Sequence, residues 1–167
     1  MSKLDESRPF FRQAVEAGIE RVVYLSVIHA DKYTNVPHFT SKHTVEHYLY
    51  IYYVNYGLNY TVLRYPNVYG PRQDPHGEAG VVAIFTGKML DKETVTIYGD
   101  GEQTRDFVFV RDCARANLLA VTVDHASGIY NIGWGRPTSI NEIFTSLAKI
   151  TSFTHPVSYG PAKVGET

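Results

Sequence analysis

The sequence predicts an α/β protein in which a doubly wound parallel sheet is joined to a smaller α/β region. Helical and strand-like patterns alternate along the first 65 residues. The segment 22–27 is a valine-rich, nearly continuous apolar run, which is typical of a strand that is buried on both faces of a parallel sheet. After Pro66 a Gly/Pro-rich loop and shorter elements follow. This change of pattern predicts a second region.

The first region is expected to contain two helix and strand pairs. In chain order these are a helix over 5–17 that Gly18 stops, a strand over 22–27, a helix over 39–56 that Gly57 ends, and a strand over 60–65. The alternation gives parallel strands with helices as crossovers, because a parallel connection needs a long return segment. We therefore assign residues 1–65 to a doubly wound sheet domain.

The second region, 66–167, is expected to be built from shorter elements that partly interleave with the sheet. These are a loop over 66–80, a helix over 80–90, strands near 95–98 and 106–110, a helix over 111–123, a strand over 129–132, a helix over 139–150, and a short strand near 157–159.

Composition narrows the class of protein. The 167 residues are 44% hydrophobic and 20% charged, which is ordinary for a globular protein with a core. A net charge of −1 argues against nucleic acid or an anionic membrane as the main partner. The single cysteine, Cys113, excludes an internal disulfide, and the sequence has no signal-peptide pattern and no apolar run long enough to span a membrane. We expect a cytoplasmic protein.

Three motifs carry a family resemblance. They are Pro37-His38-Phe39-Thr40-Ser41-Lys42, Leu63-Arg64-Tyr65-Pro66-Asn67-Val68-Tyr69-Gly70-Pro71-Arg72-Gln73, and Ile97-Tyr98-Gly99-Asp100-Gly101-Glu102-Gln103-Thr104-Arg105-Asp106-Phe107. Together they resemble the extended short-chain dehydrogenase/reductase family, and within it the NAD-dependent nucleotide-sugar epimerases and dehydratases of the UDP-glucose 4-epimerase type. The resemblance implies a Rossmann-type fold, NAD as cofactor and a UDP-sugar or related nucleotide-sugar as substrate. It also implies that residues 1–65 are the carboxyl-terminal part of a Rossmann-like NAD-binding domain and that residues 66–167 are the region that binds the nucleotide-sugar.

The glycine-rich fingerprint that cradles a dinucleotide pyrophosphate is not found in this sequence. No Gly-x-Gly-x-x-Gly occurs, and the cluster Gly99-Asp100-Gly101 lacks the third glycine and reads as a turn. In the family the fingerprint lies in the first βα turn, which would fall upstream of Met1. We therefore interpret the chain as the middle and later parts of a larger enzyme, whose amino-terminal Gly-rich part is absent.

The catalytic positions implied by the resemblance are altered. In the family a helix begins with Tyr-x-x-x-Lys, the phenol moves a proton, and a Ser or Thr at the end of the preceding strand hydrogen-bonds the reacting oxygen. Here the Lys is Lys42, the Tyr place holds His38, and the Ser/Thr place holds Val27, with Ser26 one residue earlier. Histidine can act as an acid or base near neutral pH, whereas valine cannot. We expect Lys42, His38 and Ser26 to be the catalytic candidates and the chain alone to be inactive.

The substrate and cofactor positions also follow from the resemblance. Asn67 matches the residue that hydrogen-bonds the sugar nucleotide, and Arg105 matches the arginine that binds the diphosphate, a role for which a guanidinium is well suited. Tyr98 and Val82 are further substrate-binding candidates. Lys42 and Tyr65 are the cofactor-binding candidates. For Arg105 the purely structural alternative is an ion pair with Asp106 or Asp112.

Two other functions remain open at this stage. The segment from Ser26 to Lys42 also resembles NmrA-like proteins, which bind NAD(P) and act as sensors or atypical reductases. Separately, His43-Thr44-Val45-Glu46-His47 matches the His-x-x-Glu-His pattern of a class of zinc peptidases. The epimerase interpretation assigns no metal ligand, so zinc dependence separates the peptidase from the other two functions.

The family resemblance implies a homodimer through the helices at 5–17 and 42–56. The second of these is rich in tyrosine, which suits either an interface or packing on the chain's own sheet.

Overall fold

The computed structural model describes residues 3–33, 35–76 and 80–162. It confirms the α/β class, and it divides the chain into two compact units. The first unit contains residues 1–65 and 112–132, and the second contains residues 66–111 and 133–167. The chain thus leaves the first unit after Tyr65, and residues 112–132 return to it because they supply a helix and a strand to its sheet.

A three-stranded parallel sheet organises the first unit. Its order is β1 (Arg21–Val27), β2 (Asn59–Tyr65) and β7 (Gly128–Asn131). Strand β1 runs in register with β2 from Arg21 opposite Asn59 to Val27 opposite Tyr65. The central strand β2 is the most buried of the three. The expectation that 22–27 is buried on both faces is wrong for this sheet: β1 is an edge strand, is half-buried along most of its length, and exposes Leu25 at 47%.

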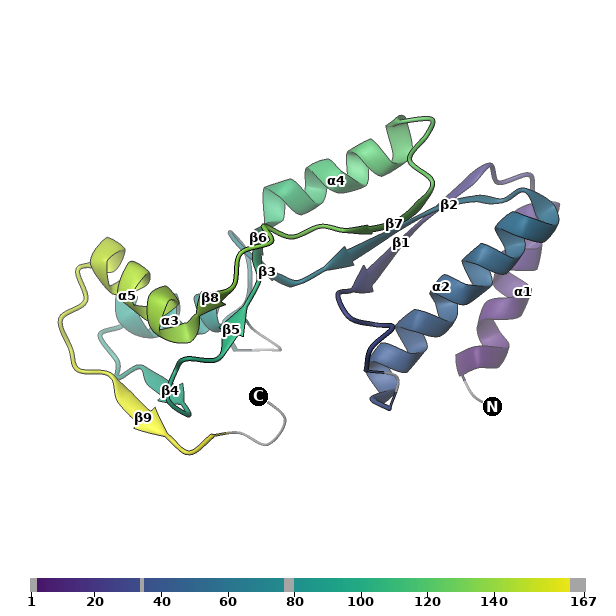
Figure 1. Ribbon diagram of the computed structural model, residues 1–167. Coiled ribbons are helices and arrows are strands. Elements are labelled where there is room, and N and C mark those ends of the chain that lie inside the picture. The colour runs from purple at the N-terminus through teal and green to yellow at the C-terminus, as the bar shows by residue number, and fades with distance from the viewer. Residues whose placement is uncertain (1–2, 34, 77–79, 163–167) are drawn as a thin grey trace. The chain divides into compact units, whose positions relative to one another are not determined.

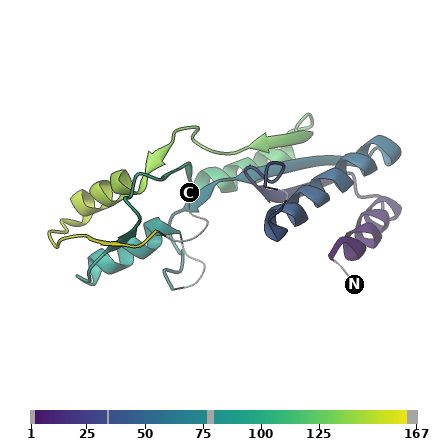
Figure 2. The ribbon, with the colours of Figure 1, turned by 60° about the horizontal axis from the view of Figure 1, so that its bottom comes forward.

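Helices cover both faces of this sheet (Figures 1 and 2). On one face α1 (Lys3–Glu16) and α2 (Pro37–Tyr56) lie side by side, and on the other lies α4 (Val110–Thr122). Alternate β2 side chains serve the two faces: Tyr60 and Val62 join the core with α1 and α2, whereas Thr61 and Leu63 line a hollow with α4. This is the doubly wound arrangement that the sequence predicts.

The second unit is made of two helices and three short strand pairs. The helices are α3 (Val81–Leu90) and α5 (Ile140–Thr151), which pack around a core of Phe85, Met89, Val95, Ile97 and Ile140. The parallel pairs are β3 (Asn67–Tyr69) with β6 (Phe107–Phe109) and β4 (Thr96–Tyr98) with β9 (Ser158–Gly160), and the antiparallel pair is β5 (Thr104–Arg105) with β8 (Thr138–Ser139).

Three of these strands were not expected from the sequence. Strand β3 lies inside the segment read as a loop, and β5 and β8 have two residues each. Strands of two or three residues are too short to show an alternation of apolar and polar residues, and the Pro and Gly residues around β3 favour the prediction of a loop. The expected longer elements all occur, with boundaries within two residues. In the described ranges, none of the helices combines the length and apolar character that a membrane crossing requires.

Candidate functional site

A groove of about 280 Å³ in the second unit gathers three of the four predicted substrate-binding residues. Asn67, Tyr98 and Arg105 reach it from three different strands, β3, β4 and β5. The rest of the lining is mainly apolar with one further amide, and consists of Gly80, Val81, Ile84, Phe85, Thr96, Ile97, Gln103, Phe107 and Ile140. The groove thus combines apolar walls with several polar groups that converge on it, and convergent polar groups in a concave site are what fix the orientation of a small-molecule ligand.

Backbone pairing fixes the position of Asn67. Both its backbone N and its side-chain Nδ2 donate to the carbonyl oxygen of Asp106, each at 3.2 Å. These bonds hold the side chain in one orientation at the start of β3. A primary amide has two N–H donors and a carbonyl acceptor, so one bond from Nδ2 leaves it further hydrogen-bonding capacity for a ligand.

Arg105 is half-buried and is placed by the pairing of β5 with β8, where it lies opposite Thr138. Its Nη1 donates to the carbonyl oxygen of Thr104 at 2.9 Å. The carboxylate of Asp106 faces elsewhere and accepts from the backbone N–H groups of Trp134 and Gly135, each at 3.1 Å. Within the described residues, no ion pair joins Arg105 to Asp106 or Asp112.

The turn between Tyr98 and Gln103 is held from both sides. Gln103 Nε2 donates to the carbonyl oxygen of Tyr98 at 2.8 Å. Asn141, near the start of α5, donates from Nδ2 to the carbonyl oxygen of Asp100 at 3.0 Å and to Glu102 Oε1 at 2.6 Å. These bonds position the end of the groove at which Tyr98 lies.

The amino terminus of α3 opens onto the same groove. Its N-cap is Gly80, which has no side chain to cap the first turn, and Val81 and Ile84 line the groove behind it. The first N–H groups of a helix carry partial positive charge and bind anions. Arg105 and this helix end therefore give the groove two features that favour an anionic ligand.

Val82 is not brought together with the other three candidates. It lines a different groove of the second unit, with Trp134 and Arg136. The reason is helical geometry: residues 81, 84 and 85 share one face of α3, whereas residue 82 lies about 100° further round. The sequence-based assignment of Val82 to the substrate site therefore lacks structural support.

In the first unit, His38 and Lys42 lie one turn apart at the start of α2. Lys42 Nζ donates to the carbonyl oxygen of Leu25 at 2.9 Å and lies 5.1 Å from the centre of the Tyr24 ring. The ammonium group is thereby held near the carboxyl end of β1, the edge at which parallel α/β sheets bind ligands. His38 is exposed and packs edge-on against Phe39.

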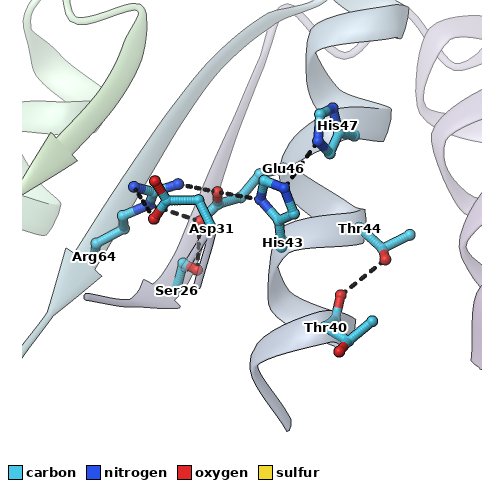
Figure 3. A network of polar contacts seen from close by, with 8 residues as sticks. All are labelled: Ser26, Asp31, Thr40, His43, Thr44, Glu46, His47 and Arg64. Atoms are coloured by element: carbon cyan, nitrogen blue, oxygen red, sulfur yellow. Dashed lines mark hydrogen bonds and ion pairs between the residues drawn. The ribbon is translucent and has the colours of Figure 1, made fainter. Parts of the chain in front are cut away.

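Ser26 belongs to a buried polar network (Figure 3). It is 4% exposed, and its Oγ donates to Glu46 Oε1 at 2.6 Å. Arg64 donates to the same carboxylate through Nε at 3.0 Å and Nη2 at 2.5 Å, and to Asp31 through Nη1 at 3.2 Å. The hydroxyl of Ser26 therefore donates its hydrogen bond to a buried carboxylate, whereas the catalytic role expected from the sequence needs this hydroxyl to hydrogen-bond a ligand. The neighbouring Val27 has no hydroxyl.

Sequence reasoning named Glu46 only within the zinc-peptidase pattern and Arg64 only within a motif, and it missed their pairing. Glu46 lies on the sheet-facing side of α2 and Arg64 lies in β2, and each is a charged residue in a largely apolar stretch. Burial opposes ionisation of Glu46, but hydrogen bonds from Arg64 and Ser26 and the charge of Arg64 outweigh it and lower the pKa of this carboxyl. Glu46 is therefore an anion, and its side chain is 2% exposed.

Tyr65, the second cofactor candidate, is tied to α4. Its hydroxyl donates to the carbonyl oxygen of Cys113 at 3.2 Å and accepts from Asn117 Nδ2 at 2.8 Å. Burial, with a smaller effect of Cys113, raises the pKa of Tyr65 to about 12, so the phenol is neutral at physiological pH. These contacts give Tyr65 a structural role at the end of β2.

The geometry does not fit the zinc-peptidase alternative. In that class the motif glutamate acts on a metal-bound water, but here Glu46 is turned into the buried network with Arg64. Among the residues that the structure describes, no group of three or more His, Cys, Asp or Glu side chains is placed to hold a metal ion.

The sheet of the first unit, covered by helices on both faces, defines a Rossmann-type α/β protein. A family model described as the NAD dependent epimerase/dehydratase family matches residues 14–133. A putative UDP-glucose 4-epimerase of Methanocaldococcus jannaschii is 47% identical over 130 residues, which are 78% of this chain and 42% of that protein. The chain belongs to the NAD-dependent epimerase/dehydratase family.

Solved structures agree with this membership. UDP-glucose 4-epimerase of Thermotoga maritima, determined with UDP-glucose, has a TM-score of 0.86 and 42% identity, and the match covers 93% of this chain and 55% of that one. UDP-glucose 4-epimerase of Thermus thermophilus, determined in complex with NAD, has a TM-score of 0.79 and 36% identity, over 93% and 56% of the two chains. The chain spans about half the length of these relatives, and the matches favour the epimerases over the NmrA-like alternative.

Proposed function

We propose that this chain is part of an NAD-dependent nucleotide-sugar epimerase of the UDP-glucose 4-epimerase type, and that the groove of the second unit binds the nucleotide-sugar. The observation that carries the proposal is the convergence of Asn67, Tyr98 and Arg105 beside the amino terminus of α3. The relatives named as UDP-glucose 4-epimerases, one of them solved with UDP-glucose, support it.

In this proposal Arg105 and the first N–H groups of α3 bind the diphosphate. A guanidinium keeps its charge and offers paired N–H donors to phosphate oxygens. The exposed amide of Asn67 hydrogen-bonds the ligand, the ring of Tyr98 covers one side of it, and the apolar lining excludes water. By the family resemblance position 66 is usually phenylalanine, and because this chain has Pro66 the sugar-side contact of that position is not part of the proposal.

The cofactor site would use the first unit. Lys42 fits such a role, because its ammonium group is held near the carboxyl end of β1 and can donate to ribose hydroxyls. Bound NAD would supply the hydride acceptor for the sugar. Tyr65 would support this edge of the sheet through its bonds to α4 rather than through a cofactor contact.

The acid/base chemistry of this chain is weakened. His38 stands in the Tyr place and is exposed, Val27 stands in the Ser/Thr place, and Ser26 is hydrogen-bonded to Glu46. We therefore expect slow or absent epimerase turnover even when the remaining half of the enzyme is supplied. The double variant Val27→Ser/His38→Tyr should raise turnover in such a complemented protein. Turnover of the unmodified sequence at a typical ~1–10³ per second would instead make His38 an effective acid/base.

The chain is also proposed to form a homodimer in the cytoplasm, through helices 5–17 and 42–56. Exposed apolar side chains on α1 and α2 support this, among them Phe10 at 59%, Tyr50 at 56% and Val54 at 60% exposure. Light scattering should give twice the chain mass, and Val54→Glu should shift it toward the monomer. A monomer at all concentrations would contradict the dimer and leave the binding site intact.

Ligand selectivity tests the proposed function. Calorimetric titration of the chain should show UDP-glucose and UDP binding with similar affinity, and no measurable binding of glucose, because the diphosphate supplies the charged contacts. Equal, weak signals for UDP and glucose would mean that the groove is not a nucleotide-sugar site.

A further inference from the structure

We propose that His43 and His47 form a chelating site for a divalent transition metal ion, of the copper(II) or nickel(II) type. The two imidazoles project from successive turns of α2, and their Nε2 atoms lie 3.0 Å apart (Figure 3). Their ring centres are 4.4 Å apart, with an interplanar angle of 71°. The two Nε2 atoms share a hydrogen bond whose direction depends on the tautomer, and a metal ion would take the place of the shared proton.

The distance between the nitrogens defines the geometry of the metal. With metal–nitrogen bonds of roughly 2.1 Å, two nitrogens 3.0 Å apart subtend an angle of about 90° at the ion. That is the angle between neighbouring ligands in square-planar and octahedral complexes. Tetragonal sites with nitrogen and oxygen ligands are typical of copper(II) and nickel(II), whereas zinc prefers the wider tetrahedral angle.

The buried carboxylate of Glu46 orients one of the two ligands. His43 Nδ1 lies 3.6 Å from Glu46 Oε2, which is too long for a hydrogen bond but close enough for the anion to favour a proton on Nδ1. Nδ1 is buried, and in the described structure it has no hydrogen-bond partner. With the proton on Nδ1, Nε2 of His43 keeps its lone pair for a metal ion, and a small approach of Nδ1 to Glu46 would complete a carboxylate–histidine–metal arrangement.

The exposure of the pair suits a metal with water ligands. In the single chain His47 is exposed and the side chain of His43 is 26% exposed, so an ion can reach the pair from solvent. Tyr50 and Val54 of the proposed dimer surface lie on the same face of α2, so the parent and its variants are titrated in the Val54→Glu background, which favours the monomer.

Only these two protein ligands are proposed, and water would fill the remaining positions. Glu46 acts through His43 and does not itself touch the ion, because Arg64 and Ser26 hold both of its oxygens.

Copper(II) titration of the full chain, with glycine as competitor, tests the site. One ion per chain should bind, and its electron paramagnetic resonance spectrum should show hyperfine coupling to two imidazole nitrogens. His47→Ala should weaken binding at least about tenfold, because even loss of a supporting group beyond the ligands typically costs that much. His47 is exposed, so the variant should keep the circular dichroism spectrum of the parent.

The matched control is His155→Ala, which removes an exposed imidazole that packs against Phe153 in the second unit. It should leave copper affinity unchanged. Equal affinity of the parent and His47→Ala would overturn the proposal. A spectrum that shows coupling to a single nitrogen would overturn it too, as would a loss of affinity in His155→Ala equal to that in His47→Ala. Neither variant changes the buried network, so the test does not depend on a destabilised variant.

Discussion

Replacing Arg64 by methionine removes the cation from the buried network while keeping most of the side-chain volume. Glu46 then loses its bonds from Nε and Nη2 and keeps only the bond from Ser26. The side chains of Glu46 and Arg64 are 2% and 12% exposed, so water cannot replace the missing donor. Loss of one partner from a buried ion pair costs about 3–5 kcal/mol, and the remaining Ser26 bond places this variant near 3 kcal/mol.

Urea unfolding followed by circular dichroism measures this loss. The free energy of unfolding falls by about 2 kcal/mol per molar urea, so a loss of about 3 kcal/mol in that free energy lowers the urea midpoint by roughly 1.5 M. The double variant Glu46→Leu/Arg64→Met removes both charges and should recover most of the loss, because no unpaired charge remains buried. Arg12→Met is the exposed control: Arg12 and Glu16 have side chains 77% and 60% exposed, and breaking that pair should cost under about 1 kcal/mol.

A cost for Arg64→Met as small as that for Arg12→Met would refute this reasoning. It would mean that Glu46 is hydrated, or that it takes up a proton without penalty. A double variant as unstable as the single one would show that shape, and not charge, is what the network contributes.

Other measurements test separate parts of the structure. Because the pKa of Glu46 is lowered on folding, its stabilisation is complete above its unfolded value of about 4.3 and is lost as pH falls through the folded value. In Glu46→Gln the free energy of unfolding should therefore fall less steeply below about pH 4.3 than it does in the parent. Gly101→Ala should destabilise more than Gly99→Ala: both glycines have positive φ, 78° and 77°, but only at Gly101 would a Cβ overlap a neighbouring side chain. Asp106→Asn should weaken the two backbone bonds from 134 and 135, cost about 1.5–3 kcal/mol, and shift the emission of Trp134, the single tryptophan.

The longer elements were predictable because their patterns are strong. The valine-rich strand β1 and the apolar β2 alternate with helices that end at glycines, and this order is enough to predict a parallel sheet. Strands β5 and β8 were not predictable, because two residues carry no periodicity and the strands pair through residues far apart in the sequence, such as Arg105 and Thr138. The return of residues 112–132 to the first unit is likewise a tertiary effect.

The residues of the candidate groove were named from the sequence more fully than the contacts of the catalytic candidates. Asn67, Tyr98 and Arg105 were named from motifs and lie around one groove. Val82 lies outside the three motifs and was grouped with these residues only as part of the helix at 80–90, whereas the structure places it on the face of α3 that lines the other groove. Ser26 was assigned by its position next to Val27, whereas its partner Glu46 lies 20 residues away on α2, and no local pattern joins the two.

The central claim is that the groove beside α3 binds a nucleotide-sugar through Arg105, and a comparison of two arginine variants tests it most directly. Arg136 is the matched control, because it is an exposed arginine of the same unit that lines the other groove. Arg105→Ala should weaken UDP-glucose binding by roughly 1.5–3 kcal/mol, measured by calorimetry, whereas Arg136→Ala should leave it within about 0.5 kcal/mol. Equal affinities of the two variants, or a larger loss in Arg136→Ala, would contradict the account.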